Sequence, residues 1–336
     1  MNAVRSPSEV SAPEGSVVLV TGGAGFIGSH LVERLLADGK SVVAIDDLST
    51  GNRKNLARVI SSPRLRLIES KISTCAELGE LANRAESIYH LAAAVGVELV
   101  VNSPIHVLET NLHETEVLLK AAAPRRVPIL LTSTSEVYGK SQKQAFGEED
   151  DLLIGTPHQA RWGYACSKLM DEFLAFAYAK ECALPIVVAR LFNTVGPRQT
   201  GRYGMVLPRF ISAAESGSPL RVYGDGQQTR CFCFVRDTVE ALVRLQSSAV
   251  ARGQIFNIGG TEEISIEALA RLVIELLNSE STIEFVPYGK AYAPGFEDMR
   301  RRKPIVDKIA EITGFRPATP LHEIIKLTAA GLEGAW

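Results

Sequence analysis

Two side chains near the middle of the sequence are spaced for proton transfer. Tyr164 and Lys168 stand four residues apart in the motif YACSK, and a helix predicted over 164–182 places them on one face. An ammonium group beside a phenol lowers the phenol's pKa toward a value useful for an acid or base. Since a half-buried tyrosine and a solvated lysine often share this spacing, the chemistry needs a further hydroxyl. Thr134 supplies one after the strand-like run PILLT, at a strand end where open α/β sheets bind ligands.

A glycine-rich segment follows the first predicted strand. In TGGAGFIG, Gly23, Gly25 and Gly28 have G-x-G-x-x-G spacing, Gly22 precedes them, and a helix predicted over 26–38 follows directly. Such glycines let the backbone approach a pyrophosphate closely, and the helix N-terminus offers that anion free N–H groups. The segment therefore predicts a dinucleotide site.

An acidic residue ends the second predicted strand. Asp46 lies 18 residues after Gly28, at the position where a carboxylate accepts both ribose hydroxyls of a dinucleotide. A carboxylate there repels a 2′-phosphate. The sequence therefore favours NAD over NADP.

The elements that must position these groups alternate along the chain. Short β-branched runs and helix-period segments follow one another through residue 192, an order typical of βαβ units. The predicted strands are 16–20, 41–45, 64–68, 87–92, 128–132 and 185–190, with a further long helix over 105–123. Beyond residue 192 the pattern loosens into a Gly- and Pro-rich stretch (195–226), the strand-like RCFCFV, and helices over 237–247 and 265–277. The pattern predicts an α/β fold.

This organisation predicts a Rossmann doubly wound parallel sheet with a small interleaved C-terminal substrate-binding lobe. Residues 16–192 form the predicted NAD-binding domain, to which 230–258 contribute. Residues 193–229 and 259–336 form the lobe. Residues 1–15 lack the apolar stretch of a signal peptide and are predicted to be a disordered leader.

Composition excludes several classes of function. The 336 residues carry 36 Lys and Arg against 38 Asp and Glu, so neither nucleic acid nor an anionic membrane is an expected partner. No apolar run approaches the roughly 20 residues that cross a bilayer. Five cysteines without a CxxC pair, and no histidine cluster, predict reduced thiols and no metal site. We expect a cytoplasmic protein.

At this point a family resemblance is plain. The segments TGGAGFIGSH, DDLSTGN, YHLAA, STSEVYG and YACSK resemble the extended short-chain dehydrogenases/reductases that act on nucleotide sugars, and the match runs from about residue 16 to 325. The resemblance implies bound NAD, with Tyr164 as acid/base for the sugar 4-hydroxyl. It implies Lys168 as the modulator of that phenol and a contact of the nicotinamide ribose, and Thr134 as a hydrogen-bonding partner.

The same resemblance implies a set of cofactor contacts. Besides Tyr164 and Lys168, they are Gly22, Gly25, Phe26, Ile27, Gly28, Asp46, Asp47, Ser49, Thr50, Gly51, Leu91 and Ala92. One departure concerns the adenine contact. The family often has Gly-Asp-Ile after the third strand, whereas this chain has Ser70-Lys71-Ile72.

The residues after Thr134 indicate which reaction follows oxidation at C4. Dehydratases of the family typically show Thr-Asp-Glu, and common 4-epimerases carry small residues at both later positions. Thr134-Ser135-Glu136 resembles instead the UDP-glucuronate decarboxylases. Because a 4-ketone is β to the C6 carboxylate, oxidation alone makes loss of CO₂ easy. Guanylyl-mannose dehydratases also carry Thr-Ser-Glu, so dehydration and 4-epimerisation stay open as alternatives.

Further residues resemble the decarboxylases' substrate site. In GFEDMRRRKPIVDKI, Arg302 is expected beside Glu136, where it positions the sugar carboxylate. The same sequence is equally typical of a basic run exposed to solvent. The pair Arg161-Trp162 before Tyr164 points to the same enzymes. Asn193 and Arg230 are implied as contacts of the nucleotide diphosphate, and Ser135 as a further substrate contact.

Other classes of function fit the sequence less well. An NAD-binding sensor or scaffold would keep the glycines and Asp46 but tend to lose Tyr164 or Lys168, and both are present. A dehydrogenase that releases NADH would need free cofactor exchange, which the sugar-nucleotide tail argues against. The helices over 105–123 and 164–182 pair with their counterparts in this family, so a homodimer is expected.

Overall fold

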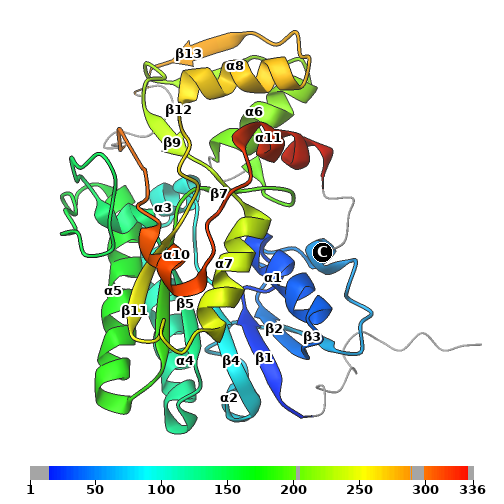
Figure 1. Ribbon diagram of the computed structural model, residues 1–336, viewed down its shortest axis with the longest axis vertical. Coiled ribbons are helices and arrows are strands. Elements are labelled where there is room, and N and C mark those ends of the chain that lie inside the picture. The colour runs from blue at the N-terminus through cyan, green and yellow to red at the C-terminus, as the bar shows by residue number, and fades with distance from the viewer. Residues whose placement is uncertain (1–14, 202–204, 288, 290–298, 332–336) are drawn as a thin grey trace, which may run out of the picture.

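A computed structural model describes residues 15–201, 205–287, 289 and 299–331. Of the predicted leader, residues 1–14 lie outside the described residues, as do 290–298 and 332–336 of the predicted lobe. Figure 1 shows a large α/β body below and a smaller group of helices and short strands above it.

A parallel sheet of seven strands forms the large body. Its strands are β1 Val17–Thr21, β2 Val42–Asp46, β3 Leu65–Glu69, β4 Ala85–His90, β5 Ile129–Thr134, β6 Ile186–Leu191 and β11 Gln254–Ile258. They lie in the order β11-β6-β5-β4-β1-β2-β3, and every pairing is parallel. All residues of β1 and β2 are buried, because helices cover both faces of the sheet. The predicted Rossmann sheet is confirmed.

Helices cover the two faces of this sheet and make two cores. Val18 and Val20 of β1 pack into the core with α1 (Phe26–Ala37) and α7 (Val235–Ser247). The alternate residues of β1 pack into the opposite core. That core includes α2 (Leu78–Arg84), α4 (Pro104–Ala122) and α5 (Ala160–Cys182). In the described part of the chain, no helix is long and apolar enough to cross a membrane.

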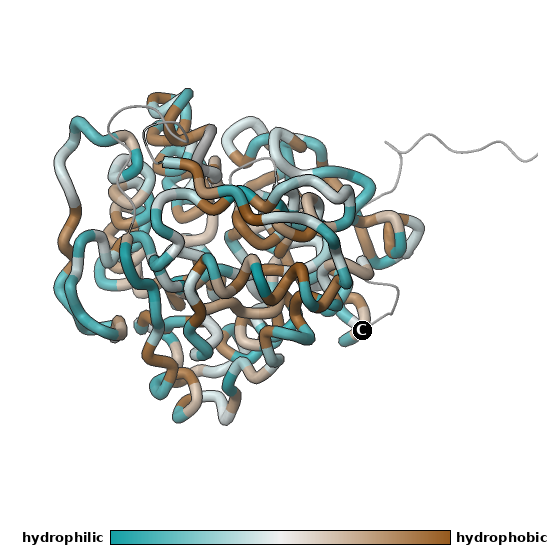
Figure 2. The backbone as a smooth tube through the Cα atoms, turned by 90° about the horizontal axis from the view of Figure 1, so that it is seen from above, coloured by the Kyte–Doolittle hydropathy of each residue, from teal (hydrophilic) through white to brown (hydrophobic). Residues whose placement is uncertain are grey.

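The upper lobe has a core of its own. Helices α6 (Val206–Glu215), α8 (Ile266–Leu276) and α11 (Leu321–Ala330) enclose it. The lobe strands are β8 Leu220–Tyr223 paired with β13 Ile283–Val286, and β9 Thr229–Cys231 paired with β12 Glu263–Ser265. Three connecting elements are α3 Val97–Asn102, β7 Thr194–Val195 and α10 Asp307–Thr313. In Figure 2 hydrophobic stretches concentrate in the interior and hydrophilic ones in outer loops.

Two elements differ from their predicted form. Helix α5 begins at Ala160, four residues before the predicted start, because Trp162 is buried in a local core and extends the helix. Tyr164 therefore lies in the second turn, with Arg161 one turn earlier on the same face. The run RCFCFV is not one strand: β9 pairs with β12, whereas β10 (Cys233–Phe234) pairs with β7, so the chain changes partner at Phe232.

Candidate active site

A cavity of about 690 Å³ lies at the carboxyl ends of the strands, between the sheet and the lobe. The strand order reverses between β1 and β4, and ligands of open α/β sheets bind at such a switch point. One end of the cavity is lined by the glycine segment after β1 and by Asp46. The other is lined by Tyr164, Arg230 and Arg302.

The glycine segment is shaped by close backbone contacts. Gly22 has φ +73°, and a Cβ there would lie 2.8 Å from the Ala92 backbone nitrogen. A Cβ on Gly28 would lie 2.0 Å from the Gly22 carbonyl oxygen, so helix α1 starts as near to β1 as possible. Gly25 is the N-cap of α1 and lines the cavity together with the first turn of the helix. Since this helix start faces the cavity without a side chain at its cap, it fits a dinucleotide pyrophosphate.

Asp46 ends β2 on the cavity wall. Its Oδ2 accepts the Ala24 N–H at 2.8 Å and its Oδ1 accepts the Leu48 N–H at 2.9 Å, which fixes the carboxylate. Burial raises the pKa of this carboxyl, and the two backbone hydrogen bonds oppose that rise. A carboxylate has about four acceptor positions, so Asp46 can still accept ribose hydroxyls. Gly51 packs behind it, since a Cβ there would lie 2.6 Å from Oδ1.

Tyr164 reaches the cavity from α5, below the end of β5. Burial raises the pKa of its phenol above the usual range and the carboxylate of Glu136 adds to the rise, while Arg302 and a hydrogen bond with Thr134 lower it. The Lys168 ammonium is paired with Asp171, at 2.7 Å from Oδ2. The expected effect of Lys168 on the phenol stays a prediction.

A charged cluster stands beside Tyr164. The Glu136 carboxylate lies between two guanidinium groups, with Oε1 3.3 Å from Arg302 Nη1 and Oε2 3.6 Å from Arg161 Nε. Arg302 also donates to Ser135 Oγ from Nη2 at 2.6 Å. All four side chains are largely screened from solvent. The expected neighbourhood of Glu136 and Arg302 is thus present, although 166 residues separate them in sequence.

The implied diphosphate contacts lie where the lobe meets the sheet. Asn193 donates to the Cys231 carbonyl oxygen at 3.0 Å, and Arg230 donates through Nη1 to the carbonyl oxygens of Thr229 and Met299 at 2.7 and 2.9 Å. These bonds fix both side chains on the cavity wall.

Most of the predicted site residues line this one cavity. They are Gly22, Gly25, Phe26, Ile27, Gly28, Asp46, Asp47, Ser49, Thr50, Leu91, Ala92, Thr134, Glu136, Tyr164, Lys168, Asn193, Arg230 and Arg302. Gly51 and Ser135 lie behind the lining, against Asp46 and Arg302 respectively. The segment Ser70–Ile72 also lines the cavity, just after β3.

Sequence reasoning gave no specific role to several lining residues. Arg161, Arg209, Tyr223 and Gln228 belong to this group. The sequence could have indicated a position for Arg161 near the site, because it stands three residues before Tyr164 in a helix. Arg209 lies on α6, Tyr223 ends β8 and Gln228 precedes β9, and the approach of these elements to the cavity depends on the tertiary structure.

Comparison with known proteins agrees with this geometry. Residues 18–259 match the family described as NAD dependent epimerase/dehydratase. The chain belongs to that family. Its cofactor is accordingly NAD, and the glycine segment and Asp46 are the features here that fit it.

Relatives within the NAD dependent epimerase/dehydratase family cover almost the whole chain. A UDP-N-acetyl-alpha-D-glucosaminuronate decarboxylase of Bacillus cytotoxicus is 40% identical over 92% of this chain and 95% of its own. UDP-glucuronic acid decarboxylase 1 of Xenopus tropicalis is 36% identical over 93% of this chain and 70% of its own. Among solved structures, UDP-glucuronic acid 4-epimerase from Bacillus cereus, in complex with UDP-glucuronic acid and NAD, has a TM-score of 0.83 at 28% identity. That alignment covers 93% of this chain and 98% of the epimerase.

Proposed function

We propose that this protein is an NAD-dependent decarboxylase of a UDP-linked uronic acid, UDP-glucuronate or its 2-acetamido counterpart. The observation that carries the proposal is the cluster of Ser135, Glu136 and Arg302 beside Tyr164 in the cavity that the glycine segment enters. The two relatives described above are both named as decarboxylases of such sugars, and they align with nearly all of this chain.

The proposed reaction begins at the sugar 4-hydroxyl. Bound NAD, held by the glycine segment and Asp46, would supply the hydride acceptor for oxidation at C4. Tyr164 takes the hydroxyl proton, and Thr134, which hydrogen-bonds the phenol, keeps its oxygen directed at that group. Lys168 supplies the nearby positive charge and contacts the nicotinamide ribose.

Decarboxylation follows from the ketone. The C5–C6 bond breaks, CO₂ leaves, and the electron pair of that bond enters the enolate formed with the 4-ketone. Arg302 holds the departing carboxylate, while Glu136 and Ser135 fix the guanidinium through the contacts described above. A proton added at C5 then gives the UDP-linked 4-keto-pentose. The reduced cofactor would supply the hydride for the UDP-pentose, and Tyr164 returns its proton to the 4-oxygen. Asn193 and Arg230 hold the diphosphate throughout.

At the cofactor end, different residues are proposed to bind different parts of NAD. The loop from Gly22 to Gly28 binds the pyrophosphate, and Asp46 binds the adenosine ribose. Asp47, Ser49 and Thr50 line the same end, and Asp47 Oδ1 accepts hydrogen bonds from the Ser49 backbone and hydroxyl at 3.0 and 2.6 Å.

The direct test is to incubate the purified protein with NAD and either UDP-glucuronate or UDP-N-acetylglucosaminuronate and to follow the products by proton NMR. We expect CO₂ together with the UDP-pentose or its 4-keto form. UDP-galacturonate from UDP-glucuronate would contradict decarboxylation and favour 4-epimerisation. Conversion of UDP-glucose alone would rule out the uronate assignment.

Epimerisation is the second candidate because the Bacillus cereus 4-epimerase that resembles this chain binds UDP-glucuronic acid and NAD. Both reactions share oxidation at C4 and differ afterwards. Epimerisation requires the 4-keto sugar to rotate within the site. The Glu136–Arg302 contact narrows the space for that rotation, which supports decarboxylation.

We further propose a homodimer formed through α4 and α5. Large apolar side chains are exposed on these helices, among them Ile105 and Phe173, which are 71% and 64% exposed, together with Leu108, Leu112 and Met170. Light scattering should give twice the chain mass, and Phe173→Glu should give the monomer mass. Val250→Glu, an equally exposed apolar position elsewhere, is the control. A monomeric unmodified protein would contradict this proposal.

A further inference from the structure

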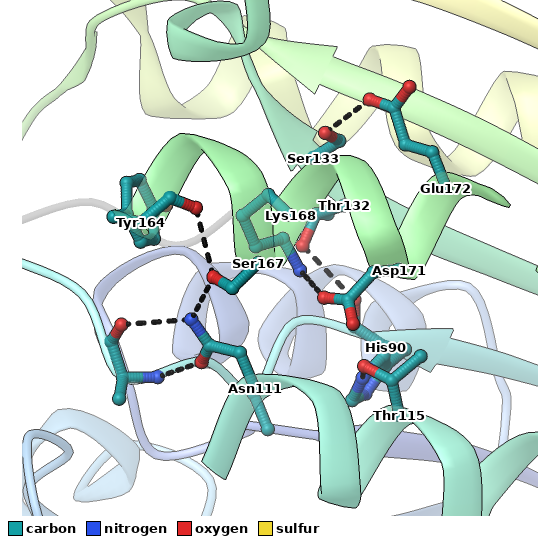
Figure 3. A network of polar contacts seen from close by, with 12 residues as sticks. His90, Asn111, Thr115, Thr132, Ser133, Tyr164, Ser167, Lys168, Asp171 and Glu172 are labelled. Atoms are coloured by element: carbon teal, nitrogen blue, oxygen red, sulfur yellow. Dashed lines mark hydrogen bonds and ion pairs between the residues drawn. The ribbon is translucent and has the colours of Figure 1, made fainter. Parts of the chain in front are cut away.

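The floor of the cavity contains a buried ion pair that the proposed reaction does not yet use. Lys168 Nζ lies 2.7 Å from Asp171 Oδ2, one turn further along α5, and the two side chains are 4% and 0% exposed. Figure 3 shows the pair between α5 and the end of the sheet. Lys168 lines the cavity, and Asp171 stands behind it. Asp171 can therefore influence the reacting groups through the lysine.

Asp171 lies at one end of a row of buried polar groups. Burial raises the pKa of this carboxyl, whereas Lys168 and the nearby Thr115 hydroxyl of α4 lower it. Thr115 Oγ1 lies 3.0 Å from His90 Nε2, and His90 Nδ1 lies 2.7 Å from Thr21 Oγ1. These buried groups extend from Asp171 to Thr21, the residue before Gly22.

The energetics of such a pair make its two members interdependent. Removing one partner of a buried ion pair leaves an uncompensated charge, whereas removing both is often tolerated. Lys168 thus depends on Asp171 for its position.

We propose that Asp171 is a positioning residue that holds the Lys168 ammonium in place on the cavity wall, where it serves the cofactor and Tyr164. This inference rests on the proposed function for the role of Lys168 in turnover, and the contact of Lys168 with NAD is what the family resemblance implies. Asp171 gives helix α5 a second turn that serves the reaction, after the turn from Tyr164 to Lys168.

Other charged groups near the pair are accounted for. Glu172, the next residue on α5, is bound by Arg190 of β6 at 2.7 Å, so it balances a different cation. From β4, His90 is neutral, since burial lowers its pKa to about 3. Glu136 and Arg302 face Tyr164 from the opposite side.

The test compares Asp171→Asn with Glu172→Gln, which removes the neighbouring buried carboxylate. NAD affinity is measured by titration calorimetry, and kcat and KM are measured with the uronate substrate. For Asp171→Asn we expect roughly tenfold weaker NAD binding and roughly tenfold to hundredfold lower kcat, with KM for the uronate within about twofold. For Glu172→Gln we expect lower stability with unchanged NAD affinity.

An unchanged kcat in Asp171→Asn, or a loss of stability without weaker NAD binding, would overturn the proposal. NAD affinity separates this inference from the proposed function, because it needs no sugar substrate. If the unmodified protein shows no turnover on uronates, weaker NAD binding by Asp171→Asn still supports the role of Asp171, and unchanged binding overturns it.

A second pair of variants keeps the test open if Asp171→Asn does not fold. Lys168→Met and the double variant Lys168→Met/Asp171→Asn are compared, since the double variant buries no unpaired charge. We expect the double variant to be more stable than Lys168→Met and to match its NAD affinity and residual turnover within about twofold. A further loss of tenfold or more would show that Asp171 acts otherwise than through Lys168.

Discussion

The two ends of the cavity are built in different ways. At the cofactor end, the loop from Gly22 to Gly28 and the carboxylate of Asp46 come from one continuous βαβ segment, and backbone geometry determines their shape. At the substrate end, Glu136, Arg230 and Arg302 come from three distant segments and are held by ion pairs and hydrogen bonds. The cofactor end therefore depends on local sequence, and the substrate end depends on how the lobe packs on the sheet.

This difference has a chemical consequence. Backbone N–H groups at a helix start suit a pyrophosphate that is the same in every turnover. Paired side chains suit a substrate end at which charge is redistributed during reaction, because guanidinium groups can hold a carboxylate in a fixed orientation. Three predictions test the comparison, beginning with the largest expected effect, and a fourth concerns the stability of the whole fold.

Tyr164→Phe should affect only the substrate end. Loss of the phenolic hydroxyl removes the proposed acid/base, so we expect kcat to fall by roughly 10³-fold. NAD binding should stay within about twofold of the unmodified protein. Both are measured on the same preparation, by NMR of the products and by calorimetry. Retained turnover would place the base elsewhere.

Arg302→Gln should lower kcat/KM for the uronate by roughly 10²-fold, because one charged hydrogen-bond donor to the carboxylate is lost. Arg300→Gln is the matched control. Arg300 is 79% exposed and pairs with Asp225, so its loss should change kcat/KM by less than about twofold. Equal effects of the two substitutions on kcat/KM would show that Arg302, like Arg300, is only a surface charge.

Gly28→Ala should disturb the cofactor end. The added Cβ would lie 2.0 Å from the Gly22 carbonyl oxygen, and such overpacking costs roughly 1–3 kcal/mol, so we expect NAD affinity to fall by roughly 10- to 100-fold. Gly79→Ala in α2 meets no atom within 4 Å and is the control, with unchanged affinity. Unchanged affinity in Gly28→Ala would mean that the loop adapts.

The smallest effect concerns stability rather than either end. Burial lowers the pKa of His30 and of His90 to about 3. Below pH 6.5 the unfolded chain binds protons that the folded chain excludes, so the free energy of unfolding falls as pH drops from about 6.5 toward 3. At pH 5 each histidine costs up to about 2 kcal/mol. This loss is measured by urea unfolding at pH 7.5 and 5.

His30→Gln provides the matched variant for the stability measurement. The glutamine amide can still donate to the Pro197 carbonyl oxygen, which lies 3.1 Å from His30 Nε2, but it does not titrate. Its loss of stability between pH 7.5 and 5 should be smaller than in the unmodified protein. An equal loss would show that His30 is not a source of the pH dependence.

The sequence predicted the framework well because its signals are local. The six strands before residue 192 and the helix that begins at Phe26 were expected within about two residues of their bounds, since β-branched runs and apolar periodicity depend on neighbours along the chain. The start of α5 was missed, because the burial of Trp162 depends on residues far away in sequence. The split of RCFCFV was missed for the same reason.

By itself the sequence determined the parallel sheet, the dinucleotide loop and the acidic residue that favours NAD, because each is encoded within one short segment. Only the tertiary structure decided that Arg161 and Arg302 enclose Glu136, and that Lys168 pairs with Asp171 rather than acting alone on Tyr164. Charge pairing depends on distance in space and on burial. Neither can be read from spacing along the chain when the partners lie on different elements or when several partners compete for one cation.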